Sequence, residues 1–325
     1  MLNSGLPEPE CSVIVPLCNK WELTRDCLTS LHAHSGEHDL QVIVVDNGSS
    51  DATAFELAPL GKSLFGDRFS AIVFSENKNF GPACNAGAKA AAAPLLFFLN
   101  NDTLMTSGWA GPLLQTMRGD AAPGAAGPLL LYEDNTVQHL GVTMGAKGVA
   151  HLYQGFPADN PVVGRERPLQ FITAAAFMIS RELFFACGGF FERYKNGFED
   201  LDLCIVIRKK GFHLQCVAAS RIYHLESRSM GRKDHDKHNG RLLEGRHGKG
   251  IYTDVHHHAL RDGFLPRIND LFTISVCLPP SEEARLLQEA APLLAEGWLR
   301  LARENPYWIQ GRETLAASFE RAKKY

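Results

Sequence analysis

The sequence predicts an α/β fold with a mostly parallel central sheet flanked by helices, followed by a C-terminal helical extension. Short apolar runs rich in β-branched residues alternate with segments of helical periodicity along residues 12–99. The runs are apolar at consecutive positions, which is typical of strands covered on both faces. Strands that alternate with helices form parallel sheets with right-handed crossovers. With 325 residues, 45% of them hydrophobic, the chain is long enough for one large domain with an appendage.

The strands and helices of the first third of the chain are marked by apolar runs and by capping residues. Strands are expected at 12–17, 41–45, 70–75 and 94–99. Capping residues predict helix starts because their side chains accept hydrogen bonds from free backbone N–H groups. Helices are expected after Asn19, with Glu22 completing a capping box, after Ser50 or Asp51 through Leu57, and with Pro82 in the first turn through Ala92.

The pattern changes in the second part of the chain. Irregular structure with short strands is expected at 119–170, followed by a strand at 170–179 and a short helix at 181–187. A helix is then expected from Glu199, closed by Gly211, and after it a strand ending at His224. The remainder is expected to form a mobile polar loop at 226–258 and helices within 280–324.

Polar loops follow the predicted strands at their carboxyl ends. They contain Pro16, 46–51, 79–85 and 100–102. An acidic cluster of Glu199, Asp200 and Asp202 opens a later helix, and His224 ends the strand after it. Ligands of parallel sheets bind beyond the carboxyl ends of the strands. Each loop alone fits ordinary turn chemistry, but together they predict a ligand site on one rim.

Composition excludes several classes of protein. A net charge of −3 creates no strong field toward nucleic acid. None of the eight cysteines forms a CxxC pair, and reduced thiols in a cytosolic protein are expected. Residues 1–10 lack the pattern of a signal peptide, and no apolar run approaches the ~20 residues that span a bilayer. We expect a cytoplasmic protein whose contact with the inner face of the plasma membrane, if any, is peripheral.

The order of these segments resembles the inverting nucleotide-sugar glycosyltransferases of family 2, above all their rhamnosyltransferase-like branch, over about residues 11–230. The matching segments are SVIVP at 12–16, VVDNGSSD at 44–51, NFG at 79–81 with NAG at 85–87, LNND at 99–102, GGF at 188–190, FEDLDL at 198–203, and His224. The resemblance implies a GT-A fold, a single Rossmann-like α/β domain. It implies a glycosyltransferase domain at 1–240, with a nucleotide-binding half at about 11–104 and an acceptor-binding half at about 105–230. A loop and a C-terminal helical extension then occupy 241–325.

The resemblance also implies a divalent metal, Mn²⁺ or Mg²⁺, on the diphosphate of the donor. The family's Asp-x-Asp motif stands here as Asn100-Asn101-Asp102, so an amide replaces one carboxylate. Asp102 and His224 are the candidate metal ligands, since hard cations take oxygen ligands and manganese also accepts imidazole. Structural alternatives are an Asx turn for Asp102 and simple packing for His224; the order of the motifs favours the ligand roles.

The acidic cluster supplies the candidate catalytic residues. Asp200 matches the family's Glu-Asp pair and is the expected general base, which takes the proton of the acceptor hydroxyl. Glu199 and Asp202 complete the cluster. Acids are also common at helix starts, and we expect one of the three, Asp202 first, to orient loops instead.

The first loops are expected to bind the nucleotide. The candidate residues are Pro16, Asn19, Asp46, Asn79, Gly81, Asn85 and Asn101. Asp46 would accept a hydrogen bond from the base or ribose, and Gly81 would let the backbone approach the diphosphate. Donor-sugar or acceptor contacts are expected at Gln138, Thr173 and Gly189, although a role in turn packing explains Gln138 equally well.

The sequence therefore predicts a metal-dependent inverting hexosyltransferase, with rhamnose among the candidate sugars, that uses a nucleotide-diphosphate sugar to extend a glycan or lipid-linked glycan of a bacterial surface polysaccharide. The alternative is a catalytically inactive glycan-binding or scaffold subunit. A nucleotidyltransferase or a dehydrogenase would need a glycine-rich loop after the first strand, where residues 16–19 read PLCN. Arg228, Arg232 and Lys233 are candidates for a lid over the diphosphate; the alternative for this segment is an unstructured charged loop. The C-terminal helices are candidates for contact with a membrane surface or a partner enzyme.

Overall fold

The computed structural model describes residues 7–145, 148–225, 235–268, 274–308 and 311. Its strands are β1 (Cys11–Leu17), β2 (Leu40–Asp46), β3 (Phe69–Val73), β4 (Leu95–Leu99), β5 (Thr103–Met105), β6 (Ala125–Leu131), β7 (Val137–His139), β8 (Val142–Gly145), β9 (Gly148–His151), β10 (Ala176–Ser180), β11 (Leu214–His224), β12 (Leu265–Ile268) and β13 (Ile274–Cys277). Its helices are α1 (Trp21–Ala33), α2 (Thr53–Phe65), α3 (Phe80–Ala90), α4 (Ala110–Arg118), α5 (Arg181–Ala186), α6 (Glu199–Lys209), α7 (Asp236–His247), α8 (Val255–Arg261), α9 (Pro280–Ala290) and α10 (Ala295–Glu304).

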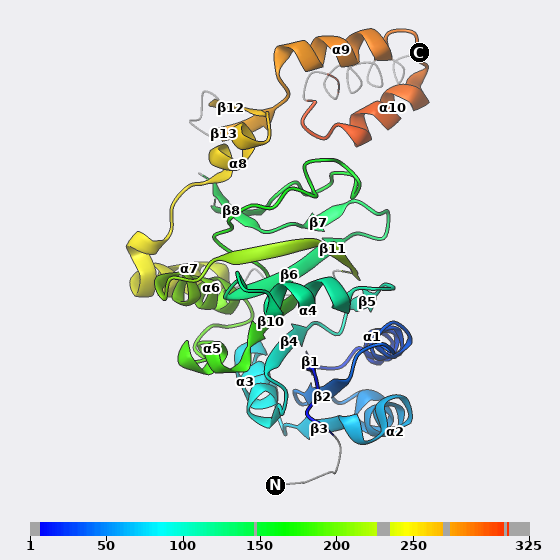
Figure 1. The fold of residues 1–325 in the computed structure, drawn as a ribbon, viewed down its shortest axis with the longest axis vertical. Helices are drawn as coiled ribbons and strands as arrows, with labels where there is room; N and C mark the ends of the chain where they lie inside the picture. Colours follow the sequence, from blue (N-terminus) through cyan, green and yellow to red (C-terminus); the bar gives the residue numbers. More distant parts are fainter. Residues whose placement is uncertain (1–6, 146–147, 226–234, 269–273, 309–310, 312–325) are drawn as a thin grey trace.

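One sheet runs through the body of the molecule. Within the described residues it has nine strands in the order β3-β2-β1-β4-β10-β6-β11-β5, with β7 paired to β6. Strands β1 to β4 are parallel to one another, β10 is antiparallel to β4 and to β6, and β11 is parallel to β6. Most strands therefore point the same way, as predicted. Figure 1 shows the N-terminal strands at one end of the molecule and α9 and α10 at the other.

Alternate residues of the central strands pack into two separate cores. Val13 and Val15 of β1 contribute to a core shared with residues of α1, α2 and α4, whereas Ile14 contributes to a core shared with α3, α5 and α6. Strand side chains alternate between the two faces of a sheet, so a strand that is apolar at every position needs helices on both. Burying both faces in this way leaves the strand ends and their loops as the place for polar chemistry.

The end of β11 lies beside the exit of β4. Strand β11 is antiparallel to β5, and this register places His224 opposite Thr103. The Leu225 N–H group donates a 2.8 Å hydrogen bond to the Asp102 carbonyl. The topology thus brings two segments together that are more than a hundred residues apart in sequence.

The predicted N-cap of the first helix, Asn19, is wrong. Asn19 and Lys20 both have a positive φ, of 59° and 62°, and α1 begins at Trp21 without a cap from Asn19. The cap comes from a distant residue, because Asp51 Oδ2 accepts the Trp21 N–H at 3.2 Å. Asp51 Oδ1 also accepts the Thr53 N–H at 3.0 Å, as predicted for the second helix.

The predicted strand at 170–179 is shorter than expected. The regular strand is β10, and before it Phe171 makes a single bridge to Val142. Residues 173–175 are not part of a strand, and their backbone groups bind site residues instead.

The predicted mobile loop at 226–258 is wrong for its described part. Residues 236–247 form α7 and the segment from Val255 belongs to α8. The many charged residues of α7 led to the prediction of a loop. The helix nevertheless has a buried face, formed by Asn239, Leu243 and His247, which recur every four residues. Residue 240, the expected domain limit, lies inside this helix. The lid candidates Arg228, Arg232 and Lys233 lie outside the described residues.

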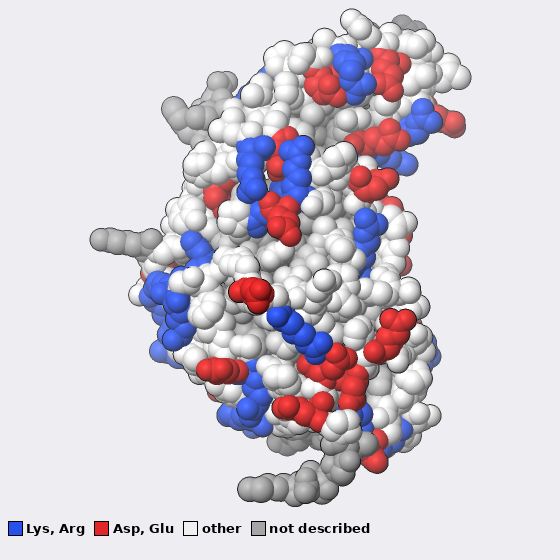
Figure 2. All heavy atoms as spheres, viewed as in Figure 1, with Lys and Arg blue, Asp and Glu red and all other residues white. Residues whose placement is uncertain are grey.

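The C-terminal elements form the helical extension that the sequence predicts. Tyr307 packs edge-on against Phe156 with ring centroids 4.7 Å apart, and Trp298 stacks on Trp308 at 5.6 Å. No helix in the described part of the chain is long and apolar enough to cross a membrane. On the face drawn in Figure 2, acidic and basic side chains are interspersed.

Candidate functional site

Asp102, His224 and Gln138 form one connected group at the junction of β4, β11 and β7. His224 Nε2 lies 3.1 Å from Asp102 Oδ1, and both side chains are buried. On its other side, His224 Nδ1 lies 2.6 Å from Gln138 Oε1. Gln138 Nε2 donates to the His224 carbonyl at 2.9 Å, which fixes the orientation of the amide. The proton of His224 is therefore on Nδ1, where it is donated to Gln138.

Nε2 faces the Asp102 carboxylate: when protonated it donates to that carboxylate, and without a proton it offers a lone pair beside it. Cis ligands of an octahedral cation with bonds of about 2.1 Å lie about 3 Å apart, and the two atoms are separated by 3.1 Å. The two donors therefore fit adjacent positions around a divalent cation. No group of three or more His, Cys, Asp and Glu residues suited to a metal ion occurs in the described ranges.

The first turn of α6 carries the three acids, and the structure gives each a different environment. Asp200 Oδ2 accepts the Ala174 N–H at 3.2 Å, and Oδ1 accepts the Leu201 N–H at 2.9 Å. Glu199 is buried and its Oε2 accepts the Gly197 N–H at 2.8 Å. Asp202 points away into a buried network that includes Arg246 Nε at 2.7 Å. Asp200 is the partly exposed carboxylate of the three.

Residues 173–175 connect the acidic turn with the segment before Asp102. The Ala174 N–H binds Asp200, while the adjacent Ala175 carbonyl accepts the Asn100 N–H at 2.9 Å, two residues before Asp102. The Thr173 N–H donates to His139 Nε2 at 3.3 Å. This short segment thus contacts both Asp200 and the start of the LNND motif.

His139 is held by a second histidine that the sequence did not single out. Its Nδ1 lies 2.8 Å from the Nδ1 of His151, from the hairpin strand β9. Since Nε2 accepts from Thr173, Nδ1 of His139 carries the proton and donates it to His151. Burial, reinforced by the neighbouring His151 and His224, holds the pKa of His139 well below its usual value.

The loops after β1 and β2 form one hydrogen-bonded unit. The Asn19 N–H donates to Ser49 Oγ at 2.7 Å, and Asn19 Oδ1 accepts the Ser50 N–H at 2.7 Å. Asp46, at the end of β2, is buried and its Oδ1 accepts the Ser49 N–H at 2.8 Å. Burial opposes ionisation of Asp51, but the hydrogen bonds from Thr53 and Trp21 hold the pKa of its carboxyl below the usual value. Pro16, paired with Val45 in the β1–β2 ladder, lies at the same corner.

Asn47 is a structural residue of this corner that sequence reasoning missed. Its Nδ2 donates to Asn77 Oδ1 and to the Asn79 carbonyl, and its Oδ1 accepts the Lys78 N–H at 2.8 Å. It therefore holds the loop before α3 in place and fixes Asn79, whose φ is 70°. The only local signal was its position in the turn after β2.

Asn85 and Gly189 lie together, away from the Asp46 corner. Asn85 is buried in α3, and its amide pairs with both backbone groups of Phe190, at 2.8 Å and 2.9 Å. Gly189 has a φ of 73°, and a Cβ there would lie 2.7 Å from Asn85 Oδ1. This arrangement joins α3 to the GGF segment. Gly81 faces the same segment, with ordinary contact distances to Phe190.

Asn101 points toward α1. Its Nδ2 donates to Thr24 Oγ1 at 2.9 Å. This bond joins the LNND motif to the helix that follows the first nucleotide loop, so Asn101 fixes the relative position of the two candidate loops.

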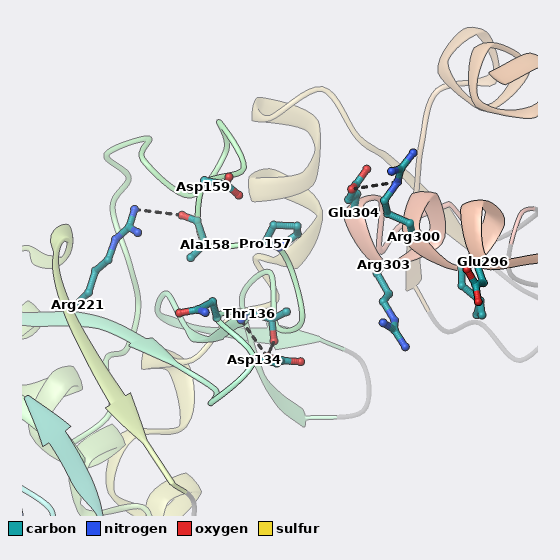
Figure 3. A pocket seen from close by; sticks show the side chains of 12 residues that line it. Asp134, Thr136, Pro157, Ala158, Asp159, Arg221, Glu296, Arg300, Arg303 and Glu304 are labelled. Carbon is teal, nitrogen blue, oxygen red and sulfur yellow. Dashed lines mark hydrogen bonds and ion pairs between the residues drawn. The ribbon is translucent and has the colours of Figure 1, made fainter. Parts of the chain in front are cut away.

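A cleft of about 850 Å³ lies between the body of the molecule and α10. Figure 3 shows Arg221 of β11 directed at the Ala158 carbonyl on one side, and Arg300 paired with Glu304 on the other. The cleft is lined by Asp134, Asn135, Thr136, Pro157, Ala158, Asp159, Arg221, Glu296, Leu299, Arg300, Arg303 and Glu304. None of the predicted site residues lines it.

Comparisons with known proteins identify the family of the chain. Residues 12–198 match the model of glycosyl transferase family 2. The O-antigen biosynthesis protein RfbC of Myxococcus xanthus is 32% identical over 230 residues, which cover 68% of this chain and 18% of RfbC. The N-acetylglucosaminyl-diphospho-decaprenol L-rhamnosyltransferase of Mycobacterium tuberculosis is 25% identical over 217 residues, or 60% of this chain and 70% of that enzyme.

A solved structure supports the fold. The crystal structure of GalNAc-T7 with UDP, GalNAc and Mn²⁺ superposes with a TM-score of 0.56 at 17% identity, covering 67% of this chain and 44% of that one. The predicted GT-A fold is confirmed. Since the family model spans more than half of the sequence, the chain belongs to glycosyltransferase family 2.

Proposed function

We propose that the chain is a metal-dependent inverting glycosyltransferase that moves a sugar from a nucleotide-diphosphate sugar to a hydroxyl of a glycan or lipid-linked glycan. The observation that carries this proposal is the Asp102–His224 pair, oriented by Gln138 and linked through residues 173–175 to Asp200. Two cation ligands and one partly exposed carboxylate on a shared frame match the two needs of the reaction, a stabilised diphosphate and an acceptor for a proton.

Asp102 and His224 would hold the cation, Mn²⁺ or Mg²⁺. When bound, the cation supplies electrostatic stabilisation for the charge that develops on the leaving nucleoside diphosphate. Asp102 and His224 would determine where the cation, and with it this stabilisation, is located. Gln138 has both ends of its amide engaged by His224, so we assign it to orienting this imidazole rather than to contact with the sugar.

Asp200 would act as the general base. Its two oxygens each accept one backbone N–H, from Ala174 and Leu201, and these bonds fix the plane of the carboxylate. A carboxylate oxygen has capacity for a further hydrogen bond, here from the acceptor hydroxyl. As the hydroxyl oxygen bonds to the anomeric carbon and the bond to the diphosphate breaks, Asp200 takes the hydroxyl proton. Attack opposite to the leaving group inverts the anomeric centre.

The nucleotide would lie against the unit formed by residues 16–19 and 46–51. Asp46 presents a buried carboxylate at the end of β2, with one oxygen engaged by Ser49 and acceptor capacity left for the base or ribose. Asn79, Gly81 and Asn101 are the further candidates for contact with the nucleotide. Thr173 and Gly189 are candidates for contact with the donor sugar or the acceptor.

The biological setting is proposed from the relatives. RfbC is named for O-antigen biosynthesis and the mycobacterial relative for rhamnosyl transfer to a diphospho-decaprenol lipid. We propose a hexosyl donor, with rhamnose as one candidate, and an acceptor in surface polysaccharide or cell-wall glycan synthesis. A cytoplasmic enzyme that meets the membrane or a partner enzyme through α9 and α10 fits a lipid-linked acceptor.

Thermal-shift titration tests the proposal directly. UDP, dTDP and GDP and their sugars are compared with and without Mn²⁺, in the native protein and in Asp46→Asn and Asp102→Asn variants. We expect one nucleotide to raise Tm in a metal-dependent way and the raise to be lost in both variants. A native protein that responds to none of these ligands but binds acceptor glycans would overturn the proposal in favour of an inactive glycan-binding or scaffold subunit.

A further inference from the structure

The acids of α6 are preceded by a backbone segment in an unusual conformation. Asn196, Gly197 and Phe198 all have a positive φ, of 47°, 138° and 75°. Asparagine tolerates this region, but for phenylalanine it is a strained conformation that persists only when the surroundings enforce it. Phe198 directly precedes Glu199, so the conformation of this segment sets the direction in which α6 begins.

One residue of α7, Asn239, forms hydrogen bonds with the backbone of the strained segment and of the residue before it. Asn239 is 1% exposed, and its Oδ1 accepts the Lys195 N–H at 3.2 Å. Its Nδ2 donates to the Lys195 and Gly197 carbonyls, both at 3.0 Å. A single amide therefore satisfies three backbone groups in the turn that leads into α6. Glu199 binds the remaining side of the turn through the Gly197 N–H.

The C-terminal end of α7 holds the other side of the first turn of α6. Asp202 is 2% exposed and accepts from Arg246 Nε at 2.7 Å, from His247 Nε2 at 2.8 Å and from Tyr194 Oη at 3.0 Å. Lys209 Nζ lies 3.0 Å from His247 Nδ1 and donates to it, so the imidazole carries its proton on Nε2 and donates that proton to Asp202. Arg246 also covers the Phe191 ring, 3.6 Å from its centroid.

The two anchor points of α7 lie on either side of Asp200. Asn239 fixes the chain before it, and Arg246 with His247 fixes Asp202 after it. Figure 1 shows α7 directly beside α6. The match to the family model ends at residue 198, so α7 lies outside the segment that the family model describes.

From these contacts we infer that α7 is a clamp for the acidic turn, in which Asn239, Arg246 and His247 are positioning residues that aim Asp200 at the acceptor hydroxyl. The inference rests on the proposed role of Asp200. It gives the three acids different roles, since Glu199 and Asp202 hold the turn and Asp200 alone faces the substrate. A small misplacement of a catalytic group lowers turnover strongly, while the proposed nucleotide corner is built by other residues, 16–19 and 46–51.

The test combines hydrogen exchange with steady-state kinetics on the full chain. Asn239→Ala removes the hydrogen bonds to the backbone of Lys195 and Gly197. Arg246→Ala removes one donor to Asp202 from a partly exposed side chain. Arg241→Ala is the control at an exposed position of the same helix. Exchange is measured in the peptide covering residues 194–203 without ligands. Transfer gives kcat and the KM for the donor, and thermal shift gives nucleotide binding.

We expect faster exchange in this peptide for Asn239→Ala and Arg246→Ala, and kcat lowered by about tenfold to a hundredfold with little change in donor KM. Arg241→Ala should match the native protein in all three readouts. Unchanged exchange in Asn239→Ala and Arg246→Ala would overturn the clamp and leave the proposed function intact. Faster exchange with unchanged kcat would show that the turn does not position a catalytic group. That result would count against Asp200 as the base as well.

Discussion

Gln138 and His224 are joined by two hydrogen bonds that run in opposite directions. The His224 ring donates to the Gln138 side-chain oxygen at 2.6 Å, and the Gln138 side-chain nitrogen donates to the His224 carbonyl at 2.9 Å. The pair fixes both the rotamer and the tautomer of the imidazole. The sequence offered Gln138 a contact near the sugar or a role in turn packing; its contacts with His224 support the orienting role that we propose for it.

Gln138→Ala should therefore weaken metal-dependent nucleotide binding. Loss of a partner that orients a metal ligand typically costs about ten- to a hundredfold in metal affinity, and we expect a shift of about this size in the Mn²⁺ concentration needed for the nucleotide to raise Tm. The matched control is Gln215→Ala. Gln215 is a glutamine of β11 whose amide donates to the exposed Glu166. Equal Mn²⁺ titrations for the two variants would reject the orienting role.

His224→Ala should remove the metal dependence of donor binding rather than merely weaken it. One of the two protein donors is then absent, and Asp102 is left as a single carboxylate at the site. The measurement is donor affinity against Mn²⁺ concentration by calorimetry. A variant that titrates with Mn²⁺ as the native protein does would rule out the ligand role.

Asp200→Asn should keep nucleotide binding and abolish most transfer. The amide is similar in size but does not accept the proton, and general-base catalysis contributes about 10²–10⁴-fold. Glu182→Gln is the control, because Glu182 is an exposed acid in the first turn of another helix, α5. Single-turnover transfer with bound donor measures the effect. A rate equal to that of the native enzyme would contradict the assignment.

His139 should make the stability of the fold depend on pH. In the unfolded chain a histidine takes up a proton as the pH falls through about 6.5, whereas burial holds the pKa of His139 in the folded protein well below this value. The unfolded state then binds more protons, so the free energy of unfolding decreases as the pH falls from about 6.5 toward the native pKa.

His139→Gln should flatten this part of the pH dependence, because glutamine does not titrate and still offers an acceptor to the Thr173 N–H. Urea unfolding between about pH 7 and pH 5, the range in which an unfolded histidine titrates, measures the slope, with the exposed His34→Gln as the control. Parallel slopes for the native protein and His139→Gln would show that His139 is not the origin of the effect.

Gly189→Ala should destabilise the fold by about 1–3 kcal/mol, since a Cβ at positive φ is strained and would lie 2.7 Å from Asn85 Oδ1. Gly164→Ala is the control, because no heavy atom lies within 4 Å of a Cβ added there and its φ is not in the positive range. Chemical denaturation of the two variants gives the difference. Equal stabilities would mean that the GGF segment adjusts at little cost.

The parts of the structure that the sequence predicts well depend on local patterns. Consecutive apolar residues identified β1, β2 and β4, which are buried almost throughout. The apolar run at β3 also marks a strand, but that strand is mostly exposed. The same patterns placed Asp102 and His224 at strand ends, and the parallel topology then brought those ends to one rim.

The parts that were missed depend on partners distant in sequence. Asp51 was expected to cap only the helix that follows it, yet it also caps α1, which begins 30 residues earlier. The helix α7 was not predicted because its sequence is rich in charged residues, although the four-residue spacing of Asn239, Leu243 and His247 is typical of a helix. The contacts of Asn47 and His151 have no such signal, since a polar side chain in a turn or hairpin does not reveal which backbone it will meet.

The hydrogen bonds between residues 19–21 and 49–51 have a consequence for grafting the proposed nucleotide corner between relatives. Asn19 binds Ser49, Ser50 and Asp51, and Asp51 in turn binds Trp21. The two loops thus form one hydrogen-bonded unit, although they are far apart in the sequence. A chimera that imports residues 46–51 alone loses the partners of both helix starts, so a working graft has to carry the Asn19 turn with it.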